Sequence, residues 1–567
     1  MSQQVFTGLA ALFTSEVVGT MAASHVHAQQ GPTAAAAQLQ VELNDTVTAR
    51  RPFIRLTPAA GVFEFHASDL VISGADDLVV DGAGVTLIFA PANGLQLIGC
   101  RRTTIRNLTL DVVPKAFTQG TIRSVEPVKA VPGSPVRLTV ALDSGYPTLE
   151  PAAAWVRAKA ILWDSSTGRL VADQGGARFV STVEMVNATH GTVVIRPHET
   201  NATGWWPVAG QRLTVSVTVG MGVLYIDNSG GGLVIEDVTI YGSGNDAIHE
   251  YFGAGGTAFR RILVSRRPTV LPGSALATSA SGRYLAALPG PLLSTNLGGL
   301  VTAVTSRGPQ LVDSEFGFMG DDFMWVHTKL AVVWKAEAAD MPSNNNTVLL
   351  RIVDPEGSKR IASSVGWGSS IQSFDLETLR NTAELRVHSV VQVTDQTLVA
   401  QAGNEVWSAM ARLGQKPIAA VTQSWELLDV SATLSTGSKI PSLADLLQSD
   451  GGAMSGAVVR NCYFHDGFCN GMRWKSSDSL IEANRIELQN GGCLAHILSQ
   501  PCAPLLCGPI GVHNVTIADN SLLGGCYGRN PIVMHGVVDL RESNNSILGR
   551  RERCDACAQP TSTDCSG

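Results

Sequence analysis

Two adjacent aspartates, Asp321 and Asp322, follow Gly320 directly after a predicted strand. Neighbouring carboxylates repel each other, so they destabilise a protein unless a site uses their charges. Glycoside cleavage requires such a pair, because a protonated acid must reach the leaving oxygen while a carboxylate activates water. We therefore interpret Asp321 and Asp322 as candidate catalytic residues. The alternative is that Asp321 caps a turn and Asp322 is solvated.

Candidate substrate-binding residues accompany the pair. His327 could hydrogen-bond a sugar hydroxyl or orient a carboxylate, although a histidine close to Trp325 is equally explained by packing. Arg473, Trp474 and Lys475 place two cations and an indole ring together in a later repeat, a combination suited to binding a sugar. Cationic side chains extended beside a core tryptophan are the structural alternative.

A six-residue repeat predicts the elements that position these side chains. Each copy begins and ends with an apolar residue and often holds Asn or Asp between them. The copies are IRNLTL (105–110), IEDVTI (235–240), FRRILV (259–264), LVDSEF (311–316), VRNCYF (459–464), IEANRI (481–486) and IADNSL (517–522). Their starts differ by 24 residues between Ile235 and Phe259 and by 22 between Val459 and Ile481.

A β-rich period in the low twenties predicts an all-β chain that folds as a right-handed parallel β-helix. Leucine-rich repeats share this period, but they need regularly placed leucines and an asparagine ladder, which the repeat lacks. Two intervals, of 130 residues before Ile235 and 148 before Val459, interrupt the pattern. Both contain alternating strands with Pro and Gly turns, which predict small inserted β-barrels or sandwiches.

The expected organisation follows from these intervals. It comprises a possible signal peptide (1–28), N-terminal β-helix coils (40–114), a first inserted β domain (115–220), central coils with the Asp-Asp motif (221–330), a second inserted β domain (331–452), C-terminal coils (453–527) and a Cys-bearing tail (528–567).

Long runs around these motifs resemble a known enzyme family. The runs are residues 212–256, RRILVSRRP (260–268), RGPQLVDSEFGFMGDDFMWVHT (307–328), NGMRWKSSDSLIEANRI (470–486) and GPIGVHNVTIADN (508–520). Together they look like the α-1,3-galactosidases of glycoside hydrolase family 110, within the pectin-lyase-like superfamily. The resemblance implies a right-handed β-helix with barrel insertions that removes terminal α-galactose with inversion and without a cofactor. It also implies that Asp321 is the general acid and Asp322 one of the base carboxylates.

One position departs from this family. The family shows an Asp-Gly pair one coil before the Asp-Asp motif, and here the matching stretch has Gly298 where the second base is expected. Polygalacturonases, on the same fold, carry Asn-x-Asp-Gly there, which this chain also lacks. Asp246 and Glu250, two or three coils upstream, are candidate substitutes on the same groove. A turn aspartate and a solvated glutamate are the structural alternative.

Composition excludes several classes of protein. The 41 Lys and Arg residues against 48 Asp and Glu give a net charge of -7, without a basic stripe, so we expect no nucleic-acid partner. Apolar stretches fall short of the ~18 residues that a membrane-spanning helix needs, so we expect no membrane segment. The expected partner is a carbohydrate, and the sequence gives no oligomeric state.

Cysteine placement and the N-terminus favour secretion. Nine of the ten cysteines follow residue 460, which fits disulfides formed in an oxidising compartment, with a metal at Cys554 and Cys557 as the alternative. Residues 1–28 contain an apolar run and end on a small-residue spacing typical of signal cleavage. Seven Asn-x-Ser/Thr sites would permit glycosylation.

The sequence thus favours a secreted glycoside hydrolase acting on terminal α-galactose. Two alternatives remain: a non-catalytic glycan-binding β-helix whose site decayed at Gly298, and a polygalacturonase-like or pectin-lyase-like enzyme that degrades polysaccharides.

Overall fold

The computed structural model consists mostly of β-strands. It describes residues 33–56, 61–66, 68–128, 135–156, 158–171, 178–195, 207–268, 270, 276, 279–327, 331–338, 347–354, 370–375, 381–412, 426–449, 454–468, 471–487, 495–498, 512–523, 532–535 and 538–548. The predicted signal peptide (1–28) lies outside the described residues.

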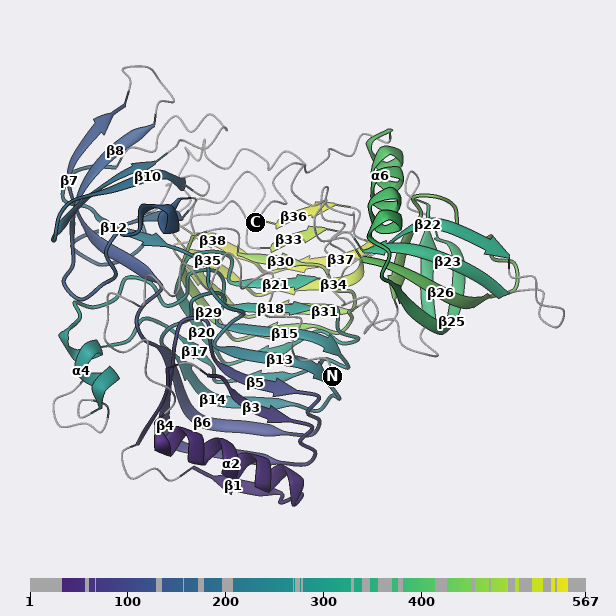
Figure 1. Ribbon diagram of the computed structural model, residues 1–567, viewed down its shortest axis with the longest axis horizontal. Helices are drawn as coiled ribbons and strands as arrows, with labels where there is room; N and C mark the ends of the chain where they lie inside the picture. The colour runs from purple at the N-terminus through teal and green to yellow at the C-terminus, as the bar shows by residue number, and fades with distance from the viewer. Residues whose placement is uncertain are drawn as a thin grey trace.

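Two parallel sheets, which we call the stack, form the centre of the molecule (Figure 1). The larger sheet has 17 strands: β1 (Phe53–Arg55), β2 (Val62–Phe65), β4 (Val79–Phe89), β6 (Thr104–Val112), β14 (Val234–Ile240), β16 (Ala258–Arg260), β17 (Leu263–Val264), β19 (Gln310–Val312), β20 (Glu315–Met319), β28 (Val458–Arg460), β29 (Tyr463–Gly467), β31 (Ser479–Glu482), β32 (Arg485–Glu487), β34 (His513–Ala518), β35 (Ser521–Leu523), β37 (Val538–Ser543) and β38 (Ser546–Leu548). The smaller sheet has nine: β3 (Leu70–Ser73), β5 (Leu95–Ile98), β13 (Leu224–Ser229), β15 (Ile248–Gly253), β18 (Leu300–Ala303), β21 (Met324–His327), β30 (Met472–Trp474), β33 (Ala495–Leu498) and β36 (Ile532–His535).

The six-residue repeats align in register across the larger sheet. The first residue of each copy pairs with the first residue of the next, in the order Ile105, Ile235, Phe259, Leu311, Val459, Ile481 and Ile517. All seven side chains are buried in the core between the two sheets. A one-residue slip would turn this column to the other face, so burial of the column fixes the register.

The prediction of a right-handed parallel β-helix is wrong. The described strands form two parallel sheets of 17 and 9 strands and two closed six-stranded antiparallel barrels, and this arrangement does not show a right-handed parallel β-helix. The repeat specifies that successive strands lie side by side in register. It does not specify the path of the chain between the two sheets, because the segments between the copies differ in length and sequence.

An asparagine ladder, which the repeat pattern did not predict, runs inside the stack. The backbone amide of Asn484 donates to Oδ1 of Asn520 at 3.0 Å, and the backbone amide of Asn520 donates to Oδ1 of Asn545 at 3.0 Å. The amide of Cys462 continues the ladder by donating to Oδ1 of Asn484 at 2.9 Å. These bonds satisfy turn amides that strand pairing leaves unpaired.

Two barrels lie on opposite sides of the stack (Figure 1). The first barrel consists of β7 (Phe117–Pro127), β8 (Val136–Leu142), β9 (Lys159–Trp163), β10 (Arg178–Asn187), β11 (His190–Ile195) and β12 (Arg212–Ser216). The second consists of β22 (Ala331–Ala338), β23 (Thr347–Asp354), β24 (Ser370–Phe374), β25 (Asn381–Val393), β26 (Glu426–Leu434) and β27 (Leu446–Ser449), with α6 (Gln396–Arg412) packed on it. Each barrel encloses its own apolar core.

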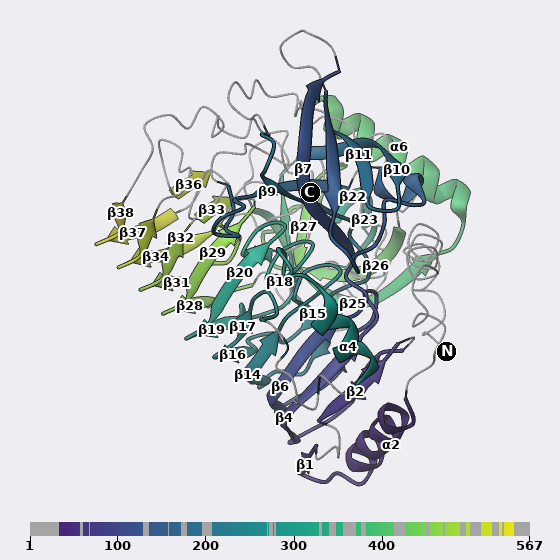
Figure 2. The same cartoon turned by 90° about the vertical axis from the view of Figure 1, so that its left-hand side faces the viewer.

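Helix α2 (Ala34–Thr48) covers the N-terminal end of the stack (Figure 2). The side chain of Thr33 accepts a hydrogen bond from the amide of Ala36, which caps the helix, and Leu39 and Leu43 are buried in the core of the stack. Covering the end in this way protects unpaired strand groups from water and from other chains. At the other end, β36 to β38 continue both sheets within 528–567, the region predicted as a tail.

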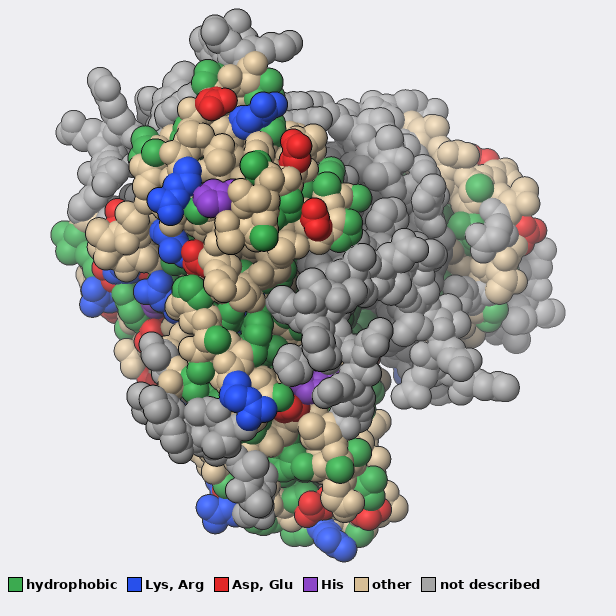
Figure 3. Space-filling model, turned by 60° about the vertical axis from the view of Figure 1, so that its left-hand side comes forward, with side chains coloured by type: hydrophobic (Ala, Val, Ile, Leu, Met, Phe, Trp, Pro, Cys, Tyr) green, Lys and Arg blue, Asp and Glu red, His purple; other side chains and the backbone are tan. Residues whose placement is uncertain are grey.

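Acidic and basic side chains are mixed on the face that carries the first barrel (Figure 3). The structure also contains a short helix, α4 (Ala280–Ala287), and a 3-10 turn, η1 (Ala152–Trp155). In the described part of the chain, we find no helix with the length and apolar character needed to cross a membrane.

Candidate active site

Three turns that precede neighbouring strands of the smaller sheet lie on top of one another. Parallel bridges join Ser243 to Thr295 and Thr295 to Met319, and the amide of Gly320 donates to the carbonyl oxygen of Thr295 at 3.1 Å. A Cβ at position 320 would lie 2.4 Å from the carbonyl oxygen of Asn296, so this close approach requires glycine. The stacked turns bring residues that are distant in the sequence to one place.

The carboxylate of Asp246 lies in the first of these turns and holds the second. Its Oδ1 accepts a hydrogen bond from the amide of Gly298 at 2.5 Å, and its Oδ2 lies 2.6 Å from Nε2 of His249. Asp246 and His249 are both buried. Both carboxylate oxygens of Asp246 are therefore fixed in orientation.

Gly298 has no room for a side chain. A Cβ there would lie 2.5 Å from the carbonyl oxygen of Asp322 and 2.8 Å from Oδ1 of Asp246. The resemblance led us to expect an aspartate at position 298. Instead, the Asp246 side chain extends from the preceding turn into this space. The Asp246 carboxylate and the Asp-Asp turn therefore both lie next to Gly298.

Asp322 is in an environment that favours a retained proton. Burial raises its pKa to about 7; Arg473 and Lys159 oppose the rise, whereas Asp321 and Asp246 add to it. Its Oδ2 lies 2.8 Å from Nε of Arg473, and its buried Oδ1 has no hydrogen-bond partner among the described residues. A carboxyl group with these properties can donate a proton near neutral pH.

Asp321 faces the first barrel. Nζ of Lys159, the first residue of β9, forms an ion pair with Oδ2 of Asp321. The two side chains are 14% and 19% exposed, so the pair lies at the border between interior and solvent. Lys159 is not predictable from the sequence, because it precedes Asp321 by 162 residues and no local motif marks it.

The outward-facing row of the smaller sheet continues the cluster across five strands. Register places in this row Tyr225, His249, Val301, Trp325 and Arg473. The Trp325 indole stacks on the ring of His327 with centroids 4.1 Å apart, and the Arg473 guanidinium lies 5.9 Å from the Trp325 centroid. The predicted residue Arg473 thus contacts the Asp-Asp turn, whereas His327 lies at the far end of β21, against the ring of Trp325.

Three predicted substrate-binding residues are buried instead. Glu250 is fully buried, where it accepts hydrogen bonds from the hydroxyls of Thr257 and Thr302, and burial raises its pKa to about 7. Trp474 lies in the core of the stack, and Lys475, which follows it, is only 1% exposed. Side chains alternate between the faces of a strand, so Glu250 and Trp474 do not join the row of His249 and Arg473.

The described cysteines differ from the expected pattern. Cys462 is a free, buried thiol, as is Cys100, and the other eight cysteines lie outside the described residues. Burial raises the pKa of the Cys462 thiol to about 12, which keeps it protonated. In the described part of the chain, no three His, Cys, Asp or Glu side chains are grouped to hold a metal ion.

No protein-family model matches the chain, and no curated protein sequence matches it significantly.

Proposed function

We propose that the protein is a secreted glycoside hydrolase that releases terminal α-galactose from a glycan with inversion and without a cofactor. The observation that supports this most directly is the meeting of Asp246 and the Asp321–Asp322 turn at Gly298. Glycoside hydrolysis needs one protonated and one ionised carboxyl group on either side of the scissile bond. The resemblance stated above supplies the sugar and the stereochemistry of the proposal.

Asp322 is the proton donor in this mechanism. Its pKa of about 7 leaves a large fraction protonated at neutral pH, so its proton can pass to the glycosidic oxygen while the bond to the anomeric carbon breaks. This assignment reverses the roles that the resemblance implied, in which Asp321 is the acid and Asp322 a base. Burial of Asp322 and the ion pair between Asp321 and Lys159 are the reasons for the reversal.

Asp246 is the base. It takes a proton from the water that attacks the anomeric carbon from the opposite face, and the Gly298 amide and His249 stabilise its charge. Asp246 precedes β15 and Asp322 precedes β21, with β18 between them. Two strand spacings of ~4.8 Å give roughly 10 Å between the backbones, and the Asp246 side chain leans towards Gly298. Inverting enzymes place the two carboxyl groups about 6.5–9.5 Å apart.

The decisive experiment is hydrolysis of a panel of aryl glycosides and galactose-terminated oligosaccharides by purified full-length protein. NMR of the first sugar released identifies its anomer. We expect β-galactose from an α-galactoside. Release of α-galactose contradicts inversion, and silence of the folded protein on the whole panel contradicts the hydrolase and favours the glycan-binding alternative.

An Asp246→Asn variant tests the base. We expect kcat to fall about 10²–10⁴-fold, because the amide cannot accept the proton of water, with thermal stability little changed. Asp478→Asn is the matched control, since Asp478 is an exposed aspartate in a turn of the stack, and it should keep full activity. Wild-type activity in Asp246→Asn would remove Asp246 from the mechanism.

A uronate-containing polysaccharide is the second candidate substrate. It is favoured by the gathering of Lys159 and Arg473 at the aspartates, with Lys475 directly after β30, because cations bind a sugar carboxylate. Both Lys159 and Arg473 are already paired with aspartates, which is why we rank a neutral galactoside first. Adding oligogalacturonates and their methyl esters to the panel separates the two candidates.

A further inference from the structure

We propose that the first barrel forms a wall of the catalytic site and that Lys159 is a positioning residue for the carboxylate of Asp321. The catalytic consequence rests on the proposed function. The contact itself belongs to the fold, so it can be tested without turnover.

Lys159 comes from a strand that is held on both sides. Its register partner is Phe179 in β10 on one side and Ser216 in β12 on the other. A side chain on a central barrel strand is placed more accurately than one on a loop. The Lys159 ammonium therefore meets Asp321 at a position that the barrel fixes.

Asn296 fastens the entry and exit of the barrel to the catalytic turns. Its Nδ2 donates to the carbonyl oxygen of Ala116, just before β7, at 2.8 Å, and to that of Val217, just after β12, at 2.6 Å. Asn296 is fully buried and lies two residues before Gly298. Both ends of the barrel are thus tied to the turn that accommodates the Asp246 carboxylate.

An apolar junction joins the far end of β9 to the strand that precedes Asp321. Trp163 in β9 is fully buried, with its ring centroid 6.4 Å from that of Phe318 in β20. Residues from the barrel and the stack share this buried cluster: Phe117, Tyr146, Ile161, Trp163, Leu170, Leu292, Leu293, Phe318 and Phe468. Burial of this junction keeps the barrel from moving freely against the site.

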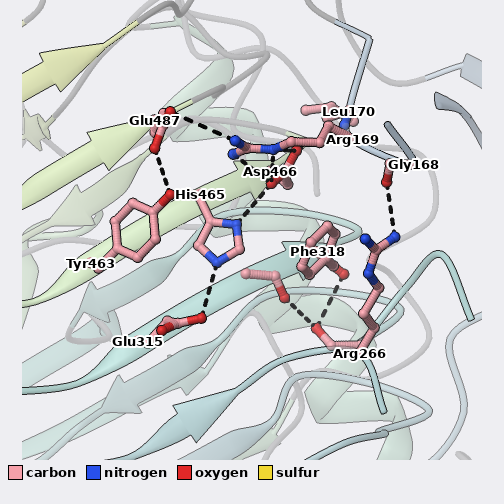
Figure 4. A network of polar contacts seen from close by, with 12 residues as sticks. Gly168, Arg169, Leu170, Arg266, Glu315, Phe318, Tyr463, His465, Asp466 and Glu487 are labelled. Atoms are coloured by element: carbon pink, nitrogen blue, oxygen red, sulfur yellow. Dashed lines mark hydrogen bonds and ion pairs between the residues drawn. The ribbon is translucent and has the colours of Figure 1, made fainter. Parts of the chain in front are cut away.

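A buried ionic network adds a third attachment (Figure 4). Asp466, which is fully buried in β29, accepts a hydrogen bond from the amide of Leu170 at 2.8 Å and pairs with Arg169 at 2.9 Å. Its other partner is His465, with Nδ1 2.7 Å from Oδ2 of Asp466. Arg169 and Leu170 lie in the segment after the turn that ends β9, and Leu170 bridges back to Trp163, so the network anchors the segment that continues from the strand of Lys159.

Lys159 is therefore placed to hold Asp321 and to offset its repulsion of Asp322. Without the Lys159 ammonium, the negative charge of Asp321 would repel the ionised form of Asp322 without compensation. Lys159 also opposes the rise in the pKa of Asp322, so its loss should raise that pKa further. The Asp322 amide donates to Oδ1 of Asp321, so a shift of Asp321 also displaces the proton donor Asp322, and a displacement of about 1 Å can lower kcat ~100-fold.

The experiment compares Lys159→Met with Lys159→Arg, which keeps the charge, in the full-length protein. Lys439→Met, at an exposed position of the second barrel, is the matched control. On the aryl α-galactoside we expect Lys159→Met to lower kcat about 10–100-fold with KM within about twofold. The basic limb of kcat/KM should move to higher pH, and Lys159→Arg should restore most of kcat. Unchanged kcat and an unchanged pH profile in Lys159→Met would overturn the proposal.

A second measurement needs no activity. The Asp322 carboxyl is titrated by ¹³C NMR of aspartate-labelled protein, with its signal assigned by its loss in Asp322→Asn. The midpoint should rise in Lys159→Met and stay unchanged in Lys439→Met. An unmoved midpoint overturns the inference even if wild type hydrolyses nothing, whereas an inactive wild type with a moved midpoint overturns only the proposed function. Lys159→Gln replaces Lys159→Met if the latter unfolds.

Discussion

Asp322 and Asp466 are both buried, but their pKa values are shifted in opposite directions. Asp466 is fully buried, yet hydrogen bonds from His465 and Arg169 outweigh burial and hold its pKa below the usual range. Asp322 is 7% exposed, and burial raises its pKa to about 7. Their depth is nearly equal, so depth does not explain the difference.

Partners explain it. Asp466 has donors at both oxygens, from Leu170, Arg169 and His465. Asp322 has Arg473 at Oδ2, a buried Oδ1 without a hydrogen-bond partner in the described part of the chain, and a second carboxylate next to it. A fully satisfied buried carboxylate stabilises the fold, whereas an incompletely satisfied one is available for proton transfer.

Asp322→Asn should give the largest effect on this comparison. The amide has no acidic proton for the leaving oxygen, so we expect kcat on an aryl galactoside to fall about 10²–10⁴-fold. Stability should be maintained, since an uncharged side chain suits the buried position. Steady-state kinetics together with thermal unfolding check both expectations. Full activity would remove Asp322 from the mechanism altogether, because an amide can serve neither as the acid nor as the base.

Asp466→Ala should affect stability instead. It leaves Arg169 and His465 without their shared carboxylate, and breaking a buried pair typically lowers the free energy of unfolding by about 3 kcal/mol or more. Asp429→Ala is the matched control, because its pair with Arg351 is 41–43% exposed and should contribute less than about 1 kcal/mol. Chemical denaturation measures both. Equal losses in the two variants would contradict the buried network as an anchor.

The sequence predicted the strand pairing of the larger sheet better than the path of the chain between the two sheets. All seven repeats lie in register, because a buried column of apolar residues leaves a strong periodic signal. The β-helix prediction failed because the repeat specifies which strands pair but not the path of the chain between the two sheets. Helix α2 was missed although its buried residues Ala36, Leu39 and Leu43 have helical spacing.

The site was only partly predictable for a related reason. Asp321 and Asp322 are visible in the sequence because they are adjacent. Asp246 was one of several candidates, and only the stacked turns show that it reaches Gly298. Lys159 and Asn296 have no local signal at all, since their partners lie far away in the chain and meet them through the docking of the barrel.

Gly298→Asp separates a decayed site from a rearranged one. If the site had decayed, restoring the aspartate would increase turnover. The structure predicts the reverse, because the new Cβ would overlap the carbonyl oxygen of Asp322 and Oδ1 of Asp246. We expect a loss of about 2 kcal/mol in unfolding free energy and lower kcat. Gly290→Asp is the control, since a Cβ there meets nothing within 4 Å. A gain of activity in Gly298→Asp would contradict the role of Asp246.

The pH dependence of stability should also differ between wild type and Asp322→Asn. The folded-state pKa of Asp322 is raised from 3.8 to about 7, so the folded protein retains a proton that the unfolded chain releases in this window. Wild-type stability therefore falls between about pH 4 and pH 7 relative to the variant, by about 3 kcal/mol. Urea denaturation at pH 4, 5.5 and 7 measures the difference. A difference that stays constant across these values would show that Asp322 ionises normally in the folded state.

His465→Gln should give the smallest effect, with a slope of the same sign but at higher pH, because the folded-state pKa is raised in both groups. Burial alone would lower the pKa of His465, but the carboxylates of Asp466 and Glu315 outweigh it and raise that pKa above 6.5. Its protonated form therefore stabilises the fold fully below pH 6.5, and this contribution is lost as pH rises through the raised folded-state pKa. We expect His465→Gln to lower the unfolding free energy by about 1 kcal/mol at pH 5.5 and by less at pH 9. Exposed His513→Gln is the control. A loss of equal size at both pH values would assign His465 a packing role against Tyr463 and Phe318 rather than an ionic one.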